Sequence, residues 1–108
     1  MDKETIIHHI RTVGRNVLPT GSNIYLYGAQ VAHEADIDAE WELLILINQE
    51  ESDRDNVDLY TFPFIKLGWN LNKPISTLLY TKQEWNDVSY TPLYQRIENR
   101  KTLLLWLP

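Results

Sequence analysis

The sequence contains no cysteine, and this absence excludes several kinds of chemistry. A chain without thiols forms no disulfide, has no cysteine nucleophile and cannot build a zinc site from cysteine ligands. It also lacks an apolar run near the 18 residues that a membrane-spanning helix needs, so we expect no membrane span. Residues 1–4 are mostly charged or polar, unlike a secretory signal segment. These features favour a cytoplasmic protein.

Positive charge is also scarce. Ten Lys and Arg residues stand against 15 Asp and Glu, so the formal net charge is −5 at pH 7, and the basic residues form no block. Tight binding to a long nucleic acid requires a basic face. The charge therefore argues against such a partner and fits a protein partner better.

What the sequence does contain is enough apolar material for one packed core. Hydrophobic residues make up 44% of the 108 positions, and they include four Trp and six Tyr. A chain of this length normally forms one domain, so we expect residues 1–108 to fold as a single unit.

Hydrophobic periodicity and turn residues predict the order of helices and strands. We expect helices over 4–18, within 53–71 and from Thr91 to about residue 100, strands over 23–27, 41–47 and 75–80, and short helical turns over 29–34 and 82–85. Pro63 lies inside the second long helical pattern and predicts a kink or a late helix start. The order predicts an α/β (α+β) fold, in which helices pack on a short mixed sheet of three or four strands.

Two carboxylates stand close together at the start of the second predicted strand. Glu40 and Glu42 are separated by one residue, and side chains at i and i+2 of a strand point to the same face. Gly28 ends the preceding strand, so we expect both carboxylates to lie beside this glycine turn. Such an arrangement suits a divalent metal ion and a phosphate group. The alternative is a solvated strand edge whose acidic spacing has no role.

The spacing resembles the active-site motif of the nucleotidyltransferase superfamily. In that family Gly-Ser is followed by ten residues and Asp-x-Asp; here Gly28-Ala29 is followed by ten residues and Glu40-Trp41-Glu42. Residues 26–28, 37–45, 79–85 and 91–97 resemble the strands and final helix of its minimal, single-domain bacterial members, which are polymerase-β-like. The resemblance covers most of residues 5–105 and implies the nucleotidyltransferase fold.

The resemblance also implies an activity and a set of site residues. Such proteins transfer a nucleoside monophosphate from an NTP, such as ATP, to an acceptor. Glu40 and Glu42 would be the catalytic acids and the Mg²⁺ ligands. The backbone of Gly28, Ala29 and Gln30 would hold the nucleotide phosphates.

The sequence departs from the family where the chemistry lies. Ala29 replaces the serine whose hydroxyl meets the phosphates, and both aspartates are replaced by the longer Glu. A third carboxylate is expected near residues 74–76 and is absent there. A misplacement of about 1 Å can cost on the order of a hundredfold in rate. We therefore expect a degenerate active site, with weak or absent nucleotidyl transfer and weak magnesium binding.

Two other functions remain open at this point. Many minimal members resemble the antitoxin half of a two-gene module, so this chain is predicted, as the alternative, to be a non-catalytic protein that binds a small helical partner. A domain that has kept only the fold is the third interpretation. The three histidines have no metal-ligand spacing and are expected on the surface.

The apolar segment Leu103-Leu104-Leu105-Trp106-Leu107 predicts an interface. Each of these side chains contributes about 1.5–3 kcal/mol on full burial, so the segment is expected to be covered. Consecutive residues of an extended chain point to opposite faces, and one domain covers only one of them. We therefore expect a homodimer or a partner chain at this segment.

Overall fold

A computed structural model describes residues 1–32, 36–48 and 56–108, and all structural statements below concern these residues. The elements in chain order are α1 (Lys3–Val17), β1 (Asn23–Tyr27), the 3-10 helix η1 (Gly28–Ala32), β2 (Trp41–Ile47), α2 (Val57–Leu71), β3 (Ile75–Thr81), α3 (Lys82–Asp87), α4 (Pro92–Glu98) and β4 (Thr102–Trp106). The first two strands have the predicted bounds. The final helix ends at Glu98, two residues earlier than expected, and the apolar tail forms a fourth strand.

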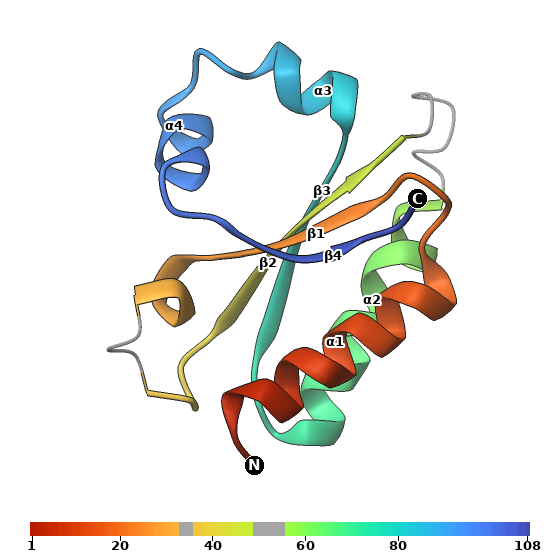
Figure 1. Ribbon diagram of the computed structural model, residues 1–108, viewed down its shortest axis with the longest axis vertical. Coiled ribbons are helices and arrows are strands. Elements are labelled where there is room, and N and C mark those ends of the chain that lie inside the picture. The colour runs from red at the N-terminus through yellow and green to blue at the C-terminus, as the bar shows by residue number, and fades with distance from the viewer. Residues whose placement is uncertain (33–35, 49–55) are drawn as a thin grey trace.

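The four strands form one mixed sheet in the order β3-β2-β1-β4. β1 is antiparallel to both β2 and β4, and β2 is parallel to β3. α2 makes the crossover between the two parallel strands, which require such a connection (Figure 1). The short mixed sheet with helices packed on it confirms the predicted fold class.

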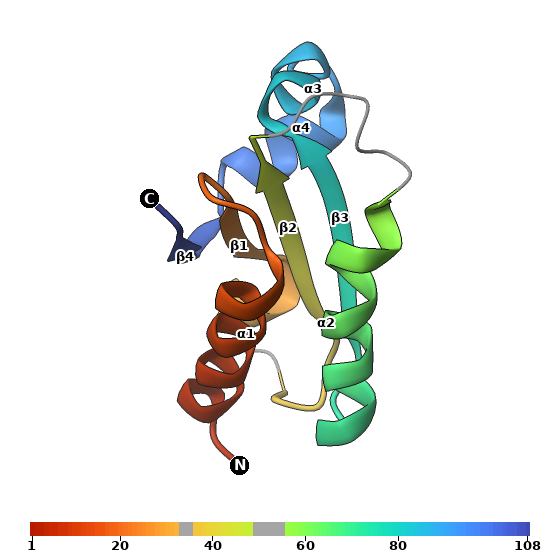
Figure 2. The ribbon, with the colours of Figure 1, turned by 90° about the vertical axis from the view of Figure 1, so that its right-hand side faces the viewer.

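The alternation of residues along β2 divides the core into two parts. Trp41, Leu43, Ile45 and Ile47 pack in one cluster with apolar residues of α1 and α2. Leu44 and Leu46 face the other way, in a second cluster with Trp85 and Ile97 of α3 and α4. Strand side chains alternate between faces, so a nearly continuous apolar run fits a strand buried on both sides. Figure 2 shows α1 and α2 along the sheet, with α3 and α4 together at one end.

The start of α4 follows its sequence signal. Thr91 caps α4, because its hydroxyl accepts from the backbone N–H of Tyr94, and Pro92 occupies the first turn. α2 begins at Val57, so Pro63 lies inside it. The predicted positions 53–55 of this helix lie outside the described residues. Within the described parts of the chain, no helix is both long and apolar enough to cross a membrane.

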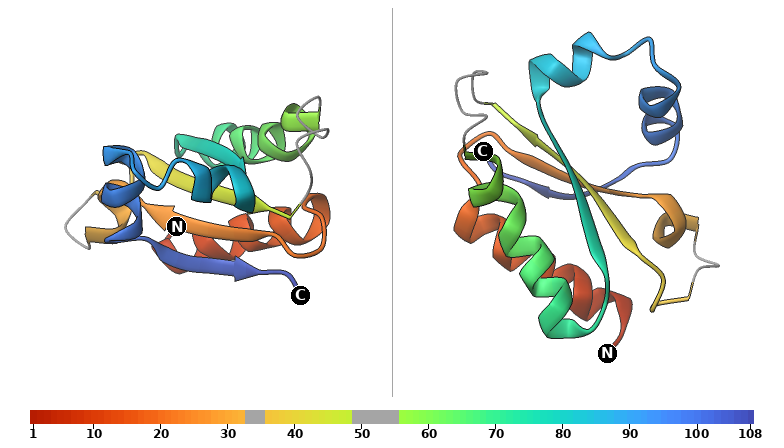
Figure 3. Two further views of the ribbon diagram at one scale, coloured as in Figure 1. Left: turned by 90° about the horizontal axis from the view of Figure 1, so that it is seen from above. Right: turned by 180° about the vertical axis from the view of Figure 1, so that it is seen from behind.

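A β-bulge decides how the apolar tail packs. The register between β1 and β4 shifts between Ile24 and Tyr25, so an extra residue is inserted in β4. As a result Leu104 and Leu105, although adjacent, both join the core cluster under α1. The expectation that consecutive tail residues point strictly to opposite faces is therefore wrong at this pair. Figure 3 shows β4 at the outer edge of the sheet.

Candidate functional site

Glu42 lies directly against the glycine turn. Its Cα is paired with that of Tyr27, the residue before Gly28, across the antiparallel strands. Gly28 has a φ of +77°, and a Cβ placed on it would come within 1.7 Å of Glu42 Oε2. Only glycine fits both this backbone conformation and this close approach. The structure thus brings together the glycine and the second carboxylate of the motif, as the spacing predicts.

Glu42 is the Cα partner of Tyr27 across the antiparallel strands, so these two side chains lie on one face of the sheet, whereas Glu40 lies in the loop just before β2. Burial, followed by the negative charges of Glu42 and Glu40, raises the pKa of the Tyr27 phenol to about 12, while Arg96 of α4 opposes the rise. Both negative charges therefore act on this one phenol. Glu40 is exposed and Glu42 is half-buried, so both are open to solvent.

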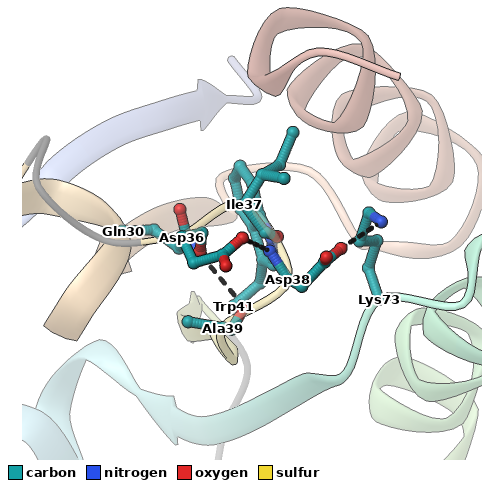
Figure 4. A network of polar contacts seen from close by, with 7 residues as sticks. All are labelled: Gln30, Asp36, Ile37, Asp38, Ala39, Trp41 and Lys73. Atoms are coloured by element: carbon teal, nitrogen blue, oxygen red, sulfur yellow. Dashed lines mark hydrogen bonds and ion pairs between the residues drawn. The ribbon is translucent and has the colours of Figure 1, made fainter.

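Ala29 and Gln30 occupy η1 in different ways. Ala29 is exposed and offers no hydroxyl to a ligand. Gln30 is only 3% exposed, and its amide Nε2 donates to the carbonyl oxygens of Asp36 (2.8 Å) and Ala39 (3.0 Å). Its side chain therefore braces the loop that leads into Glu40 (Figure 4). This role was not predicted, and no local pattern in the sequence indicates it.

Three further contacts fix the same loop. The backbone N–H of Asp38 donates to Asp36 Oδ1 at 2.9 Å, and Trp41 Nε1 donates to the carbonyl of Ile37 at 3.0 Å. Lys73 Nζ pairs with Asp38 Oδ1 at 2.5 Å. Figure 4 shows these residues around the loop. The carboxylates of Asp36 and Asp38 are thus both used in contacts that hold the loop.

The donor set is small for a metal site. Ser76 of β3 is the Cα partner of Glu42 on β2, and it lies within residues 74–76, where the family resemblance led us to expect a third carboxylate. Within residues 1–32, 36–48 and 56–108, no group of three or more His, Cys, Asp or Glu is placed to hold a metal ion. Two carboxylates suit a single Mg²⁺ that keeps most of its water. They do not fit a pair of metal ions, which needs more bridging ligands.

Comparisons with known proteins support the fold. No family profile matches the sequence, and no curated protein matches it either. The structure is similar to a chain in a crystal structure of a toxin-antitoxin with AMP-PNP, with a TM-score of 0.63. The two sequences are 17% identical, and the similarity covers 93% of this chain and 73% of the other.

The architecture and this similarity together define the class of fold. The chain has an α+β fold with a four-stranded mixed sheet, consistent with the expected nucleotidyltransferase-like fold, and it shares this architecture with a chain of that toxin-antitoxin structure. At 17% identity the similarity concerns the fold alone, and the role of each site residue remains a prediction.

Proposed function

We propose that this chain is a toxin–antitoxin-type protein that acts by binding a protein partner, and that its nucleotidyl transfer is weak or absent. The observation that carries the proposal is the incomplete acidic site: Glu42 packs on Gly28, but its neighbour on β3 is Ser76. A protein that has the fold but lacks part of the acidic site is expected to act through its surface rather than through catalysis.

The geometry explains why catalysis is expected to be poor. In a two-metal reaction the ions stand about 3.5–4 Å apart and contact both the attacking and the leaving oxygen. Glu40 is exposed and Glu42 is held against Gly28, so the two carboxylates would give a single cation only a loosely defined site. Ala29 also removes a hydroxyl donor beside the phosphates. Each of these changes makes the positions of the metal ion and the phosphates less exact, and the rate depends on those positions.

The partner that fits best is a small helical protein encoded beside this chain. The resemblance to antitoxin-type members supports this choice, and the similarity to a chain of a toxin-antitoxin structure agrees with it. The net charge of −5 also fits a protein better than a long nucleic acid.

Co-expression with the neighbouring gene tests the proposal. We expect a stable complex in size-exclusion chromatography with light scattering, formed without added nucleotide or Mg²⁺. The variant with Glu40→Gln and Glu42→Gln is the matched control and should bind equally well, because the partner contact does not depend on a metal. Absence of a complex with any helical neighbour would contradict the partner-binding function.

Magnesium-dependent transfer of a nucleoside monophosphate is the second candidate. It is favoured by one observation, namely that the Glu42 carboxylate lies against Gly28, with Glu40 two residues earlier in the chain. Glu40 and Glu42 would hold the Mg²⁺, which would polarise the phosphates, while the backbone of residues 28–30 would orient them. We expect the triple variant Ala29→Ser, Glu40→Asp, Glu42→Asp to bind Mg²⁺ and ATP more tightly than the wild type.

Transfer of label from α-labelled ATP to the partner measures this activity directly. Turnover by the wild type within the usual enzyme range of about 1–1000 per second would refute the expectation of a weak site. If the triple variant shows no change in magnesium-dependent ATP affinity, the motif assignment is wrong.

A further inference from the structure

The helix α2 is apolar on two opposite sides. Its inner side belongs to the core, through Tyr60, Phe64, Leu67 and Leu71. On the outer side, Leu59 is 66% exposed, Phe62 is 48% exposed and Trp69 is 69% exposed. A helix that is apolar all round is normally buried on all sides. The outer side of α2 is therefore expected to be covered by another chain.

The neighbouring helix α1 has an outer side of the ordinary, solvated kind. α1 and α2 lie side by side along the sheet (Figure 2), and α2 lies in front when the molecule is seen from behind (Figure 3). The exposed residues of α1 are all polar or charged: Glu4, Thr5, His8, Thr12, Arg15 and Asn16. The exposed apolar residues are thus a property of α2 and not of the helical layer as a whole.

The exposed residues of α2 have the spacing of a coiled-coil seam. Three of them are apolar and one is charged, and they are separated by three, four and three positions: Leu59, Phe62, Lys66 and Trp69. This spacing places them in one line along the helix. The rings of Phe62 and Trp69 meet edge to face, with centroids 5.7 Å apart. Lys66 is exposed, and within the described part of the chain no ion pair involves it. We call these four residues the α2 seam.

The α2 seam is complementary to a second copy of itself. Leu59 and Trp69 are equally far from Phe64, and so are Phe62 and Lys66. A two-fold axis at Phe64 would therefore place Leu59 against the partner's Trp69 in an antiparallel pair of helices. It would also place Lys66 against the ring of the partner's Phe62, and a cation over an aromatic face is attracted to it. A parallel pair would instead bring the two Lys66 side chains together, so the charge favours the antiparallel pair.

We propose that two copies of this chain associate through the α2 seam, as an antiparallel pair of α2 helices about a two-fold axis. This inference goes beyond the proposed partner-binding function and does not depend on it. The two rings of one copy expose about 250 Å² together, given that a buried aromatic side chain covers about 150–250 Å². A standard interface buries about 800 Å² per partner, so the α2 seam is the apolar centre of a small and weak dimer.

A second copy fits the α2 seam better than other occupants do. A two-fold contact uses the same patch on both subunits, and this patch supplies both the apolar side chains and the ring that faces Lys66. The two lysines are then four positions apart along the paired helices, which is about 6 Å. A long nucleic acid requires a basic surface, and one lysine among apolar residues does not provide it.

Sedimentation velocity of the full chain alone, over a series of concentrations, tests the proposal. We expect the wild type to change from one chain to two as the concentration rises. The variant Phe62→Ser, Trp69→Ser should weaken dimerisation by at least about a hundredfold, because each dimer loses four rings and one hot-spot residue alone is commonly worth about 30-fold. Lys66→Glu should weaken it by about tenfold, because the contact between the cation and the ring is lost twice in each dimer.

Two matched variants on another surface are the controls. Leu103→Ser, Trp106→Ser removes the two exposed apolar side chains of β4, and Arg100→Glu reverses an exposed charge just before that strand. Both should leave dimerisation unchanged. Thermal unfolding checks that each variant is folded, and Lys66→Glu still tests the α2 seam if the variant without the two rings is not.

The absence of cysteine from the chain allows a direct test of the register. Leu59→Cys and Trp69→Cys are introduced in separate chains, which are then mixed under mild oxidation. We expect a disulfide-linked pair only in the mixture, in which the second contact between Leu59 and Trp69 stays intact. In either variant alone the two thiols would be ten positions, or about 15 Å, apart along the helices. A disulfide requires Cα atoms within about 7 Å.

Three outcomes would overturn the proposal. The wild type could remain a monomer at every concentration, the β4 variant Leu103→Ser, Trp106→Ser could dissociate the dimer, or Leu59→Cys alone could form the disulfide, as in a parallel pair. The occupant is also wrong if Phe62→Ser, Trp69→Ser leaves the chain alone unchanged but abolishes its complex with the neighbouring protein. If no such complex forms while the wild type dimerises, the proposed function fails and the α2 seam stands.

Discussion

Replacing Gly28 by alanine tests the contact at the centre of the candidate site. An L-residue at a φ of +77° costs about 1–2 kcal/mol. The added Cβ would also stand 1.7 Å from Oε2 and 2.8 Å from Cδ of Glu42, so the carboxylate has to rotate away. An off-rotamer side chain costs about 0.5–1.5 kcal/mol. We therefore expect Gly28→Ala to lower the free energy of unfolding by about 2–3 kcal/mol and Tm by on the order of 10 °C.

A double-mutant cycle separates the two contributions. In a Glu42→Ala background the carboxylate is gone, so Gly28→Ala should cost only the backbone part, about 1–2 kcal/mol. The coupling between the two positions should then be about 1 kcal/mol, measured by urea unfolding at equilibrium. Gly21→Ala is the matched control, because Gly21 has a φ of +86° and its added Cβ would meet Asn48 rather than Glu42.

One outcome of this cycle would refute the contact between Gly28 and Glu42. If Gly28→Ala destabilises the wild type and the Glu42→Ala variant equally, Glu42 does not rest on Gly28. The reasoning from the motif spacing to the site would then be refuted. Coupling between Gly21→Ala and Glu42→Ala would likewise show that the effect is not specific to the glycine turn.

Three further predictions follow from particular contacts. Gln30→Ala leaves two loop carbonyls without their donor and should cost about 1–3 kcal/mol in urea unfolding; an unchanged midpoint would contradict the bracing role. The Tyr27 phenol, with a pKa of about 12, should ionise after an ordinary tyrosine near 10 in an absorbance titration. The phenol loses its proton at a higher pH in the folded state than in the unfolded state. The neutral phenol therefore contributes its full stabilisation below pH 10, and this stabilisation is lost as the pH rises towards 12. Glu42→Gln should lower this pKa, and no change would place the carboxylate elsewhere. Leu105→Ala should cost about 2–5 kcal/mol, whereas Leu103→Ala should stay within about 0.5 kcal/mol, because only Leu105 is buried; equal losses would contradict the bulge.

Local patterns were sufficient to predict most of the architecture. The run 41–47 is apolar at almost every position, and it forms the inner strand β2 with those bounds. Thr91 and Pro92 predicted a helix start, and Thr91 caps α4 there. These signals are reliable because helix capping and strand alternation depend only on residues that are close together in the sequence.

The pairing of the glycine turn with the acidic strand was also predictable, but only through its spacing. Gly28 and Glu42 are 14 positions apart, and the antiparallel register of β1 and β2 brings them into contact. The bracing by Gln30 was not predictable, because its acceptors are backbone carbonyls whose positions depend on the path of the loop. Every residue has a backbone carbonyl, so residue types do not indicate which carbonyl accepts a hydrogen bond.

The sequence by itself determined that an α+β fold forms and that the Glu42 carboxylate lies beside the glycine turn at Gly28, because periodicity and local turn chemistry encode both. Only the tertiary structure decided which side chains of the apolar tail are buried. Its residues are similar in type, yet Leu104 and Leu105 are buried while Leu103 and Trp106 are exposed. The difference arises from the bulge opposite β1, which is a property of two paired strands far apart in the chain.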